Sequence, residues 1–418
     1  MSTTTYYVLS IGITLCFLMN AGVGANDLAN VMSTAIGSKS INVRQAIFIA
    51  IIFEFAGAFL GGTGVTETMR DHIISTSSLT HDPNILIKGM LSILLACTIW
   101  MNLASFLGLP ISITNALVGS MVGFGTVVLG SSAIHWNKVL TIAISWVTSP
   151  IIAGSTSFAL FSSMQMLIFV KPDPLQKAKR YIPFYLFLLG TVLSFITIHK
   201  GLIHFNLHHS KQQNLIITLI CSFALTLVGY IWLKCLPEKI MLRRHERFVQ
   251  IEKHFAYLMA LTTCVMVFAH GSNDVSLAVA PLSIIHTLLT QPNTHKLVNN
   301  YPAWIILLGC VGVISGFLAY GKKVIETVGS NITALTPSRA FAATLAAATT
   351  VVVANSTGIP VSATQTLVGA VLGVGLARGI GALNLIVIRN IFMSWIFTLP
   401  AASFLTILMY FLIGYVGG

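Results

Sequence analysis

Two aspartates lie at matching places within long apolar stretches of the sequence. Asp27 and Asp274 each follow an asparagine, and glycines stand close before both pairs. In a membrane span a carboxylate is costly and is by default a candidate for function. The glycines weaken a helix locally, and freed carbonyl groups with the carboxylate would form an oxygen-rich site for a hard cation. We therefore predict Na⁺ at Asp27 and Asp274; the alternative is a pair of carboxylates that only stabilise the fold.

A third acidic residue, Glu54, also lies inside an apolar stretch. It can bind a cation or a proton, or it can pair with a neighbouring polar group, and the sequence favours neither. The corresponding position in the second half of the chain is Val313, so this carboxylate is not duplicated. The residues predicted to bind a cation are Asn26, Asp27, Asn30, Glu54, Asn273 and Asp274.

A Pro-x-Ser-x-Thr element begins at Pro110 and again at Pro360. Each proline stands where an apolar segment would start a helix. The backbone N–H groups and hydroxyls of that first turn, at the positive end of the helix dipole, can bind an anion. Two such helix starts could hold a phosphate without a buried arginine. The alternative is that the Ser and Thr side chains only cap the first N–H groups of their own helices. The residues predicted to bind the anion are Ser112, Thr114, Asn115, Ser362, Thr364 and Gln365.

The composition supports a membrane setting for these residues. Of the 418 residues, 55% are hydrophobic and only 8% are charged, against about 25% charged in a soluble protein. The formal net charge of +12 would raise nucleic acid as a partner in a soluble protein. Here the basic residues gather in particular loops between apolar runs, so no nucleic-acid partner is predicted.

The apolar runs match the thickness of a bilayer and predict an all-α polytopic membrane protein with twelve crossings. Some runs are too long for one straight crossing, so we expect broken or re-entrant helices. The predicted spans are 5–36, 43–62, 85–106, 109–130, 139–170, 182–198, 213–233, 255–290, 302–320, 340–357, 360–378 and 385–416.

The loops 171–180 and 234–253 are strongly basic. Two predicted spans separate them, so both lie on one side. Because Lys and Arg are enriched in cytoplasmic loops, this side is assigned to the cytoplasm. Counting outward then places both termini outside, in a multi-pass protein of the plasma membrane.

The two halves of the chain repeat five short motifs in the same order, about 250 residues apart. An odd number of predicted crossings separates the starts of the halves, so the halves have opposite orientations. Such inverted repeats are typical of secondary transporters, which bind substrate and coupling ions near the midplane. The predicted units are a first repeat at 1–170, two linking spans with basic loops at 171–254, and a second repeat at 255–418.

The sequence does not favour an enzyme. It contains no nucleophile–base set and no metal motif such as His-Glu-x-x-His. The six cysteines include no Cys-x-x-Cys pair, so neither a disulfide framework nor a cysteine metal site is predicted. We expect no cofactor, with Na⁺ or H⁺ as the coupling ion.

Residues 24–30, Gly-Ala-Asn-Asp-Leu-Ala-Asn, resemble a signature of the inorganic phosphate transporter (PiT) family, and residues 271–275 resemble its second signature. Leu277 stands where that family often has another asparagine. The Ser-x-Thr elements and Glu54 resemble the family as well, and the likeness covers both halves. It implies symport of inorganic phosphate through the bilayer, driven by a cation gradient, by a homodimer.

The resemblance leaves the coupling ion open. Residues 33–39 are more similar to the Na⁺-coupled branch, whereas other members use H⁺ with a metal–phosphate complex. Met90 and Thr344 stand where animal members carry membrane glutamates. The other readings are a transporter of another oxyanion such as sulfate, and a channel.

Overall fold

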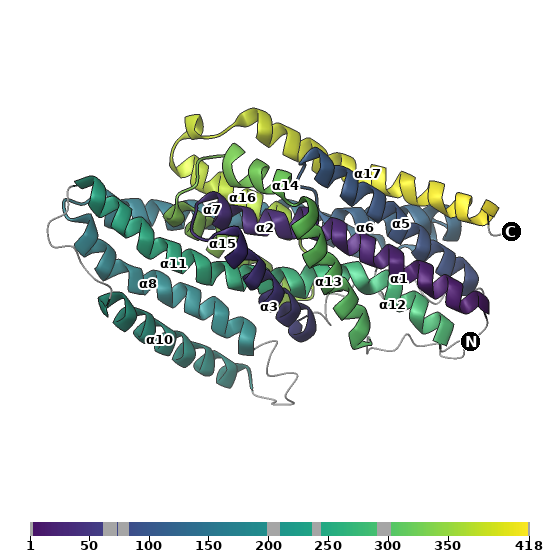
Figure 1. The fold of residues 1–418 in the computed structure, drawn as a ribbon, viewed down its shortest axis with the longest axis horizontal. Helices are drawn as coiled ribbons and strands as arrows, with labels where there is room; N and C mark the ends of the chain where they lie inside the picture. Colours follow the sequence, from purple (N-terminus) through teal and green to yellow (C-terminus); the bar gives the residue numbers. More distant parts are fainter. Residues whose placement is uncertain are drawn as a thin grey trace.

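The computed structural model describes residues 3–61, 73, 83–198, 210–235, 244–290 and 302–416. In this part of the chain the elements are all helices, which confirms the predicted all-α class. Most of the helices run roughly along the longest axis of the molecule, and α1 begins at the end where α17 finishes (Figure 1). The linking helices α8 and α10 lie at one edge (Figure 1).

Ten of the described helical segments are long and apolar enough to cross a membrane, and two further apolar helices are shorter. Together they account for the predicted number of about twelve membrane segments. The α-helices are α1 (Thr3–Val23), α2 (Ala29–Gly37), α3 (Val43–Gly61), α5 (Pro83–Leu107), α6 (Ile113–Phe124), α7 (Trp136–Met164), α8 (Pro174–Ile196), α10 (Lys211–Cys235), α11 (Arg244–His270), α12 (Ser276–Thr290), α13 (Ala303–Tyr320), α14 (Lys322–Glu326), α15 (Pro337–Ser356), α16 (Ala363–Ala377) and α17 (Leu385–Val416).

Each of the two signature segments forms one wide, π-helical turn inside a long helix. The turn η1 (Gly24–Leu28) joins α1 to α2, and the turn η7 (Gly271–Val275) joins α11 to α12. Such turns are rare in proteins as a whole, and those that occur are often found at functional sites. The break expected in these two long runs is therefore a wide turn and not an unwound segment.

Helices α5 and α6 form a hairpin that enters and leaves near the same end of α17. The Lys88 ammonium, near the start of α5, lies 5.7 Å from the centre of the Tyr410 ring. At the end of α6, the centre of the Phe124 ring lies 5.6 Å from that of the same tyrosine. The loop between the two helices lies much deeper, where the Trp395 indole N–H donates to the Pro110 carbonyl at 2.9 Å. At 1.5 Å per residue, Tyr410 and Trp395 are about 22 Å apart along α17.

Helices α15 and α16 form the matching hairpin against α7. Near the start of α15, the Arg339 guanidinium lies 5.9 Å from the centre of the Phe161 ring. One turn away on α7, the Ser157 hydroxyl donates to a carbonyl of α16 at 2.6 Å. The loop of this hairpin lies farther along α7, where the Ser145 hydroxyl donates to the Pro360 carbonyl at 3.3 Å. The two hairpins lie toward opposite ends of the molecule (Figure 1).

We call residues 108–112 the first tip and residues 357–362 the second tip. Gly108 and Gly358, with φ of +70° and +72°, end the entering helices in the left-handed conformation. Both hairpins turn back inside the protein, which agrees with the expected re-entrant helices, and the number of crossings stays a prediction. Hydropathy reports apolar length and not the path of a helix end. The tips carry no Lys or Arg. The distribution of Lys and Arg between the two sides is therefore the same whether these helix pairs cross the membrane or turn back within it.

The packing of the two π turns repeats between the halves. Gly24 in η1 lies against the Val313 carbonyl of α13, and Gly271 in η7 lies against the Glu54 carbonyl of α3. Glu54 and Val313 occupy matching positions, so each turn packs on the matching helix of the opposite half. This arrangement agrees with the predicted inverted repeat. The unit boundaries 1–170, 171–254 and 255–418 stay a prediction.

Gly24 has no room for a side chain, because an added Cβ would overlap the Val313 carbonyl oxygen. Backbone cannot move aside as a flexible side chain can, so we expect Gly24→Ala to destabilise the protein by roughly 1–3 kcal/mol or more. The matched control is Gly381→Ala, where nothing lies within 4 Å of the added atom. Thermal unfolding of the purified protein in detergent measures both, and equal Tm values for the two variants would contradict this packing.

Candidate functional site

Asn26 and Asn273 fix the two tips to the π turns. Asn26 Nδ2 donates to the Leu109 carbonyl at 2.9 Å, and its Oδ1 accepts from the Ile111 N–H at 2.9 Å. Asn273 Nδ2 donates to the Val361 carbonyl at 2.8 Å. Buried backbone groups outside regular structure need such partners. Both asparagines therefore hold the tips in place, and their part in cation binding stays a prediction.

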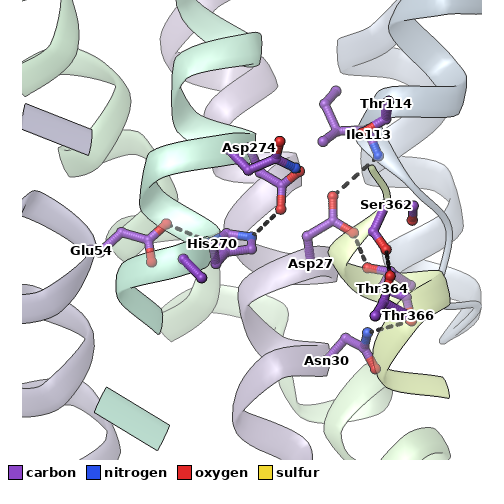
Figure 2. Close-up of polar contacts among 12 residues, drawn as sticks. Asp27, Asn30, Glu54, Ile113, Thr114, His270, Asp274, Ser362, Thr364 and Thr366 are labelled. Carbon is purple, nitrogen blue, oxygen red and sulfur yellow. Dashed lines mark hydrogen bonds and ion pairs between the residues drawn. The ribbon is translucent and has the colours of Figure 1, made fainter. Parts of the chain in front are cut away.

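The Asp27 carboxylate joins the two hairpins. Its Oδ2 accepts from the Ile113 N–H at 3.2 Å, at the start of α6. Its Oδ1 accepts from the Thr364 hydroxyl, in the first turn of α16. Figure 2 shows the carboxylate between these two helix starts. A single buried side chain of η1 thus contacts the first turns of α6 and α16.

Asp274 has a different surrounding, although it occupies the matching position. Its Oδ2 lies 3.3 Å from His270 Nε2, and its Oδ1 accepts from Asn273 Nδ2 at 3.0 Å. The other ring nitrogen, His270 Nδ1, lies 2.6 Å from Glu54 Oε1. Figure 2 shows the imidazole between the two carboxylates. Glu54 therefore pairs with a polar neighbour, which was one of its two predicted roles.

Sequence reasoning missed His270. This residue stands directly before the second signature and ends α11, and its side chain is completely buried. The available signal was a histidine within an apolar run at the position that matches Val23 in the first half. An isolated histidine in such a run gives no indication of its partner, and Glu54 lies 216 residues away in sequence.

The four predicted hydroxyl groups lie at the two helix starts, but their contacts differ. Ser112 and Ser362 are the residues directly before α6 and α16. The Ser362 Oγ accepts from the Gln365 N–H at 3.1 Å, whereas Ser112 makes no such capping bond. The Thr114 hydroxyl donates to the Val361 carbonyl of the second tip at 3.5 Å. Thr114 and Thr364 therefore each contact a residue that belongs to the other half.

The remaining predicted residues lie around this centre. Asn30 Nδ2 donates to the Thr364 carbonyl at 3.5 Å. Asn115 and Gln365 line a mostly apolar cavity of about 820 Å³ whose other walls come from α7, α16 and α17. The side-chain amide oxygens of Asn115 (Oδ1) and Gln365 (Oε1) are buried and have no hydrogen-bond partner among the described residues.

The electrostatics of the centre favour a positive ligand. Asp27, Glu54 and Asp274 are buried, and His270 is the only basic side chain that the structure places in contact with a member of this set within the described residues. The described buried residues include neither Lys nor Arg. Unbalanced negative charge in a low-dielectric interior is costly unless a cation or a proton compensates for it. No described group of three or more His, Cys, Asp or Glu residues has the arrangement of a metal site.

The sequence is similar to those of known membrane transporters along nearly its full length. The phosphate transporter family matches residues 23–406. A protein of Haemophilus influenzae named "Putative phosphate permease" is 44% identical over 400 residues, which cover 95% of this chain and 94% of that protein. A protein of Pyrococcus furiosus with the same description is 37% identical over 401 residues, covering 95% and 94% of the two chains.

One solved structure has the same fold. It is described as "The sodium-dependent phosphate transporter" and superimposes with a TM-score of 0.88 at 33% sequence identity. The match covers 98% of this chain and 100% of that chain. The likeness therefore extends over nearly the whole of both chains.

Proposed function

Because the chain belongs to the phosphate transporter family, we propose that it moves inorganic phosphate across the plasma membrane by symport with Na⁺. Phosphate transport by an integral membrane protein follows from the family and from the membrane-spanning helices. The family consists of transporters, so the expectation that the protein is not an enzyme is confirmed. The cation and its coupling to phosphate are the proposed part.

The surrounding of Asp27 is the observation that supports a coupling cation. This carboxylate is buried, and its hydrogen-bond partners among the described residues, the Ile113 N–H and the Thr364 hydroxyl, are both neutral. Neutral donors orient a carboxylate but leave its charge uncompensated, so a cation at or near it, or a proton on it, is needed. Na⁺ prefers oxygen ligands, which the side chains of Asp27 and Asp274 supply. The solved relative described as sodium-dependent supports Na⁺ over H⁺.

The two tips are suited to bind phosphate between them. Helices α6 and α16 begin at these tips, and the first N–H groups of a helix have no intrahelical acceptor. The positive dipole ends and the hydroxyls of Ser112, Thr114, Ser362 and Thr364 favour an oxyanion. Asn115 and Gln365 would add amide donors from the next position in each helix. This arrangement supports a phosphate site without any Lys or Arg among the buried residues that the structure describes.

The hairpins suggest how the site is opened to each side. They enter from opposite ends of the molecule, and the Asp27 carboxylate contacts both of them in the interior (Figures 1 and 2). In inverted-repeat transporters, movement of one repeat against the other exposes a fixed central site alternately to the two sides. Cation and phosphate bound together between the tips would then cross as one unit. We further propose a homodimer in the plasma membrane with both termini outside.

The decisive experiment is uptake of radiolabelled phosphate into proteoliposomes under an imposed Na⁺ gradient. We expect accumulation that requires inward Na⁺ and that excess sulfate does not compete away. Accumulation driven by a pH gradient in choline medium would indicate H⁺ coupling. Equal competition by sulfate would indicate a general oxyanion carrier, and unitary currents without accumulation would indicate a channel.

Removing single hydroxyls at the tips is expected to weaken phosphate binding. A hydrogen bond to a charged ligand is worth roughly 1.5–3 kcal/mol, so Ser112→Ala and Thr114→Ala should each raise the phosphate Kd about ten- to a hundredfold. Ser362→Ala should also lower the Tm, because it removes the cap on the Gln365 N–H. Phosphate titration of the purified variants measures the Kd. Unchanged Kd values in all of them would place the anion elsewhere.

A further inference from the structure

A basic pocket lies between the two linking helices and the N-terminal part of α11. Its volume is about 400 Å³, and its described walls come from α8, α10 and α11. These three helices lie at one edge of the molecule (Figure 1). The polar side chains at the pocket are Gln176, Lys179, Arg180, Tyr230, Lys234 and His254. The described residues that line it include neither Asp nor Glu, so the pocket concentrates positive charge.

The pocket lies where the apolar spans meet the basic loops. Lys179 stands just before the predicted span 182–198. Lys234 directly follows the predicted span 213–233. Both positions are on the side that the distribution of Lys and Arg assigns to the cytoplasm. The pocket is therefore placed at the depth of the lipid headgroups in the cytoplasmic leaflet.

One polar side chain of the pocket is buried. His254 is only 8% exposed, and its Nδ1 lies 2.7 Å from the Gln250 carbonyl oxygen, one turn earlier in α11. Because a carbonyl only accepts, Nδ1 carries a proton and donates it to this bond. The other ring nitrogen, Nε2, has no hydrogen-bond partner among the described residues. An anion beside the ring favours the imidazolium, whose Nε2–H can donate to that anion.

The surface next to the pocket favours a lipid over a free phosphate ion. The Lys234 ammonium lies 4.7 Å from the centre of the Tyr230 ring, and tyrosines are enriched at the boundary between membrane and water. Leu227 and Ile231 are exposed, and their spacing puts them on the same face of α10 as Lys234. An apolar strip thus leads from the basic pocket toward the middle of the bilayer. A phospholipid presents a phosphate group and acyl chains in this same order.

We propose that the pocket binds the phosphate group of an anionic phospholipid, with an acyl chain along the exposed face of α10. Lys and Arg bind phosphate oxygens through charge-assisted hydrogen bonds. Basic pockets between membrane helices on the cytoplasmic side are suited to anionic headgroups. Helix α10 packs chiefly on α8 among the described helices, so a lipid that bridges α8, α10 and α11 fastens α10 to the rest of the protein. This site goes beyond the proposed function and does not depend on the coupling ion.

Native mass spectrometry of the delipidated protein, titrated with phosphatidylglycerol, measures the affinity for the first bound lipid. Each Lys or Arg close to an anionic headgroup contributes about fivefold in affinity. The double variant Lys179→Gln and Lys234→Gln is therefore expected to bind phosphatidylglycerol roughly 25-fold more weakly than the wild type.

The matched control is the double variant Lys171→Gln and Lys253→Gln. It removes one charge from each of the same two basic loops, at positions that are not among the described residues lining the pocket. This control should bind phosphatidylglycerol like the wild type. Equal weakening in the two double variants would show that the loops attract the lipid by their overall charge, and it would overturn the pocket.

Two further titrations identify the source of the phosphate group. Phosphatidylcholine should bind more weakly than phosphatidylglycerol, because its choline balances the charge of its own phosphate. Inorganic phosphate should not displace bound phosphatidylglycerol, since it has no acyl chain to lie along α10. Equal affinity for the two lipids would contradict an anionic lipid. Displacement by an equal concentration of inorganic phosphate would assign the pocket to the free ion and overturn the lipid.

A charge-preserving variant separates binding from folding. Lys179→Arg with Lys234→Arg keeps both positive charges and should retain the affinity for phosphatidylglycerol. Phosphatidylglycerol should also raise the Tm of the wild type and of this arginine variant, but not that of the glutamine variant, because only a bound ligand stabilises the folded state. If the arginine variant loses lipid binding as fully as the glutamine variant does, positive charge at the pocket does not hold the lipid and the proposal is wrong.

Discussion

Asp27→Asn is expected to abolish Na⁺-driven phosphate uptake in a protein that still folds and inserts. The asparagine carbonyl oxygen can still accept from the Ile113 N–H, and the Thr364 hydroxyl can rotate to accept from the new amide. The variant therefore loses the negative charge and not the link between the hairpins. Loss of a charged contact of roughly 1.5–3 kcal/mol lowers cation affinity about ten- to a hundredfold, and without the cation the transport cycle stops.

Uptake into proteoliposomes measures this effect, and the Tm with the elution profile in detergent reports folding. Asp173→Asn is the matched control, since it makes the same change at a carboxylate that is 64% exposed and pairs with Arg247 at the surface. This control should transport like the wild type. A wild-type uptake rate in Asp27→Asn would remove Asp27 from cation binding, whatever the Tm.

Na⁺ and phosphate are expected to bind with positive cooperativity. The buried carboxylates repel a phosphate between the tips, and a cation at Asp27 offsets that repulsion. Linkage requires the effect to be reciprocal, so Na⁺ must tighten phosphate by the factor by which phosphate tightens Na⁺. A coupling of about 1–3 kcal/mol corresponds to a shift of roughly 5–150-fold in each affinity.

The measurement is a phosphate titration of the purified protein in Na⁺ and in choline, followed by Na⁺ binding with and without phosphate. Choline is the control for ionic strength, because it screens charge without entering an oxygen-lined site. If Na⁺ tightened phosphate binding by a different factor from that by which phosphate tightens Na⁺ binding, the two ligands would not be linked through one binding equilibrium. If phosphate affinity ignores Na⁺ and instead strengthens at lower pH, a proton replaces Na⁺ as the coupling ion.

Composition and short motifs were enough to predict the class of protein, and they identified candidate residues that the structure brings together around Asp27. Apolar runs, few charges and basic loops report how each segment meets the bilayer, and this information is local in the sequence. The repeated motifs predicted the inverted repeat, since they preserve order and spacing. Asp27 and the Ser-x-Thr elements were predicted because a buried charge and a helix start can be recognised from neighbouring residues alone.

Only the tertiary structure decided where the apolar segments lead. Helices α5, α6, α15 and α16 are apolar, yet each pair turns back at a glycine of positive φ, at Gly108 or Gly358. Where a helix leads depends on its packing against α7 or α17, which lie far away in sequence. Hydropathy contains no information on such packing, so the position of the two hairpin loops inside the protein could not be predicted from the apolar runs.

The pairing of side chains was likewise decided by the fold. Asp27 contacts Thr364 across 337 residues of sequence, and Glu54 contacts His270 across 216. The sequence placed Asp27 and Asp274 at equivalent positions, and equivalence of position was taken as equivalence of role. In the structure one carboxylate joins two hairpins through neutral donors, while the other faces an imidazole. Local pattern identifies a costly group, but the charge that compensates for it is set by which distant segment packs beside it.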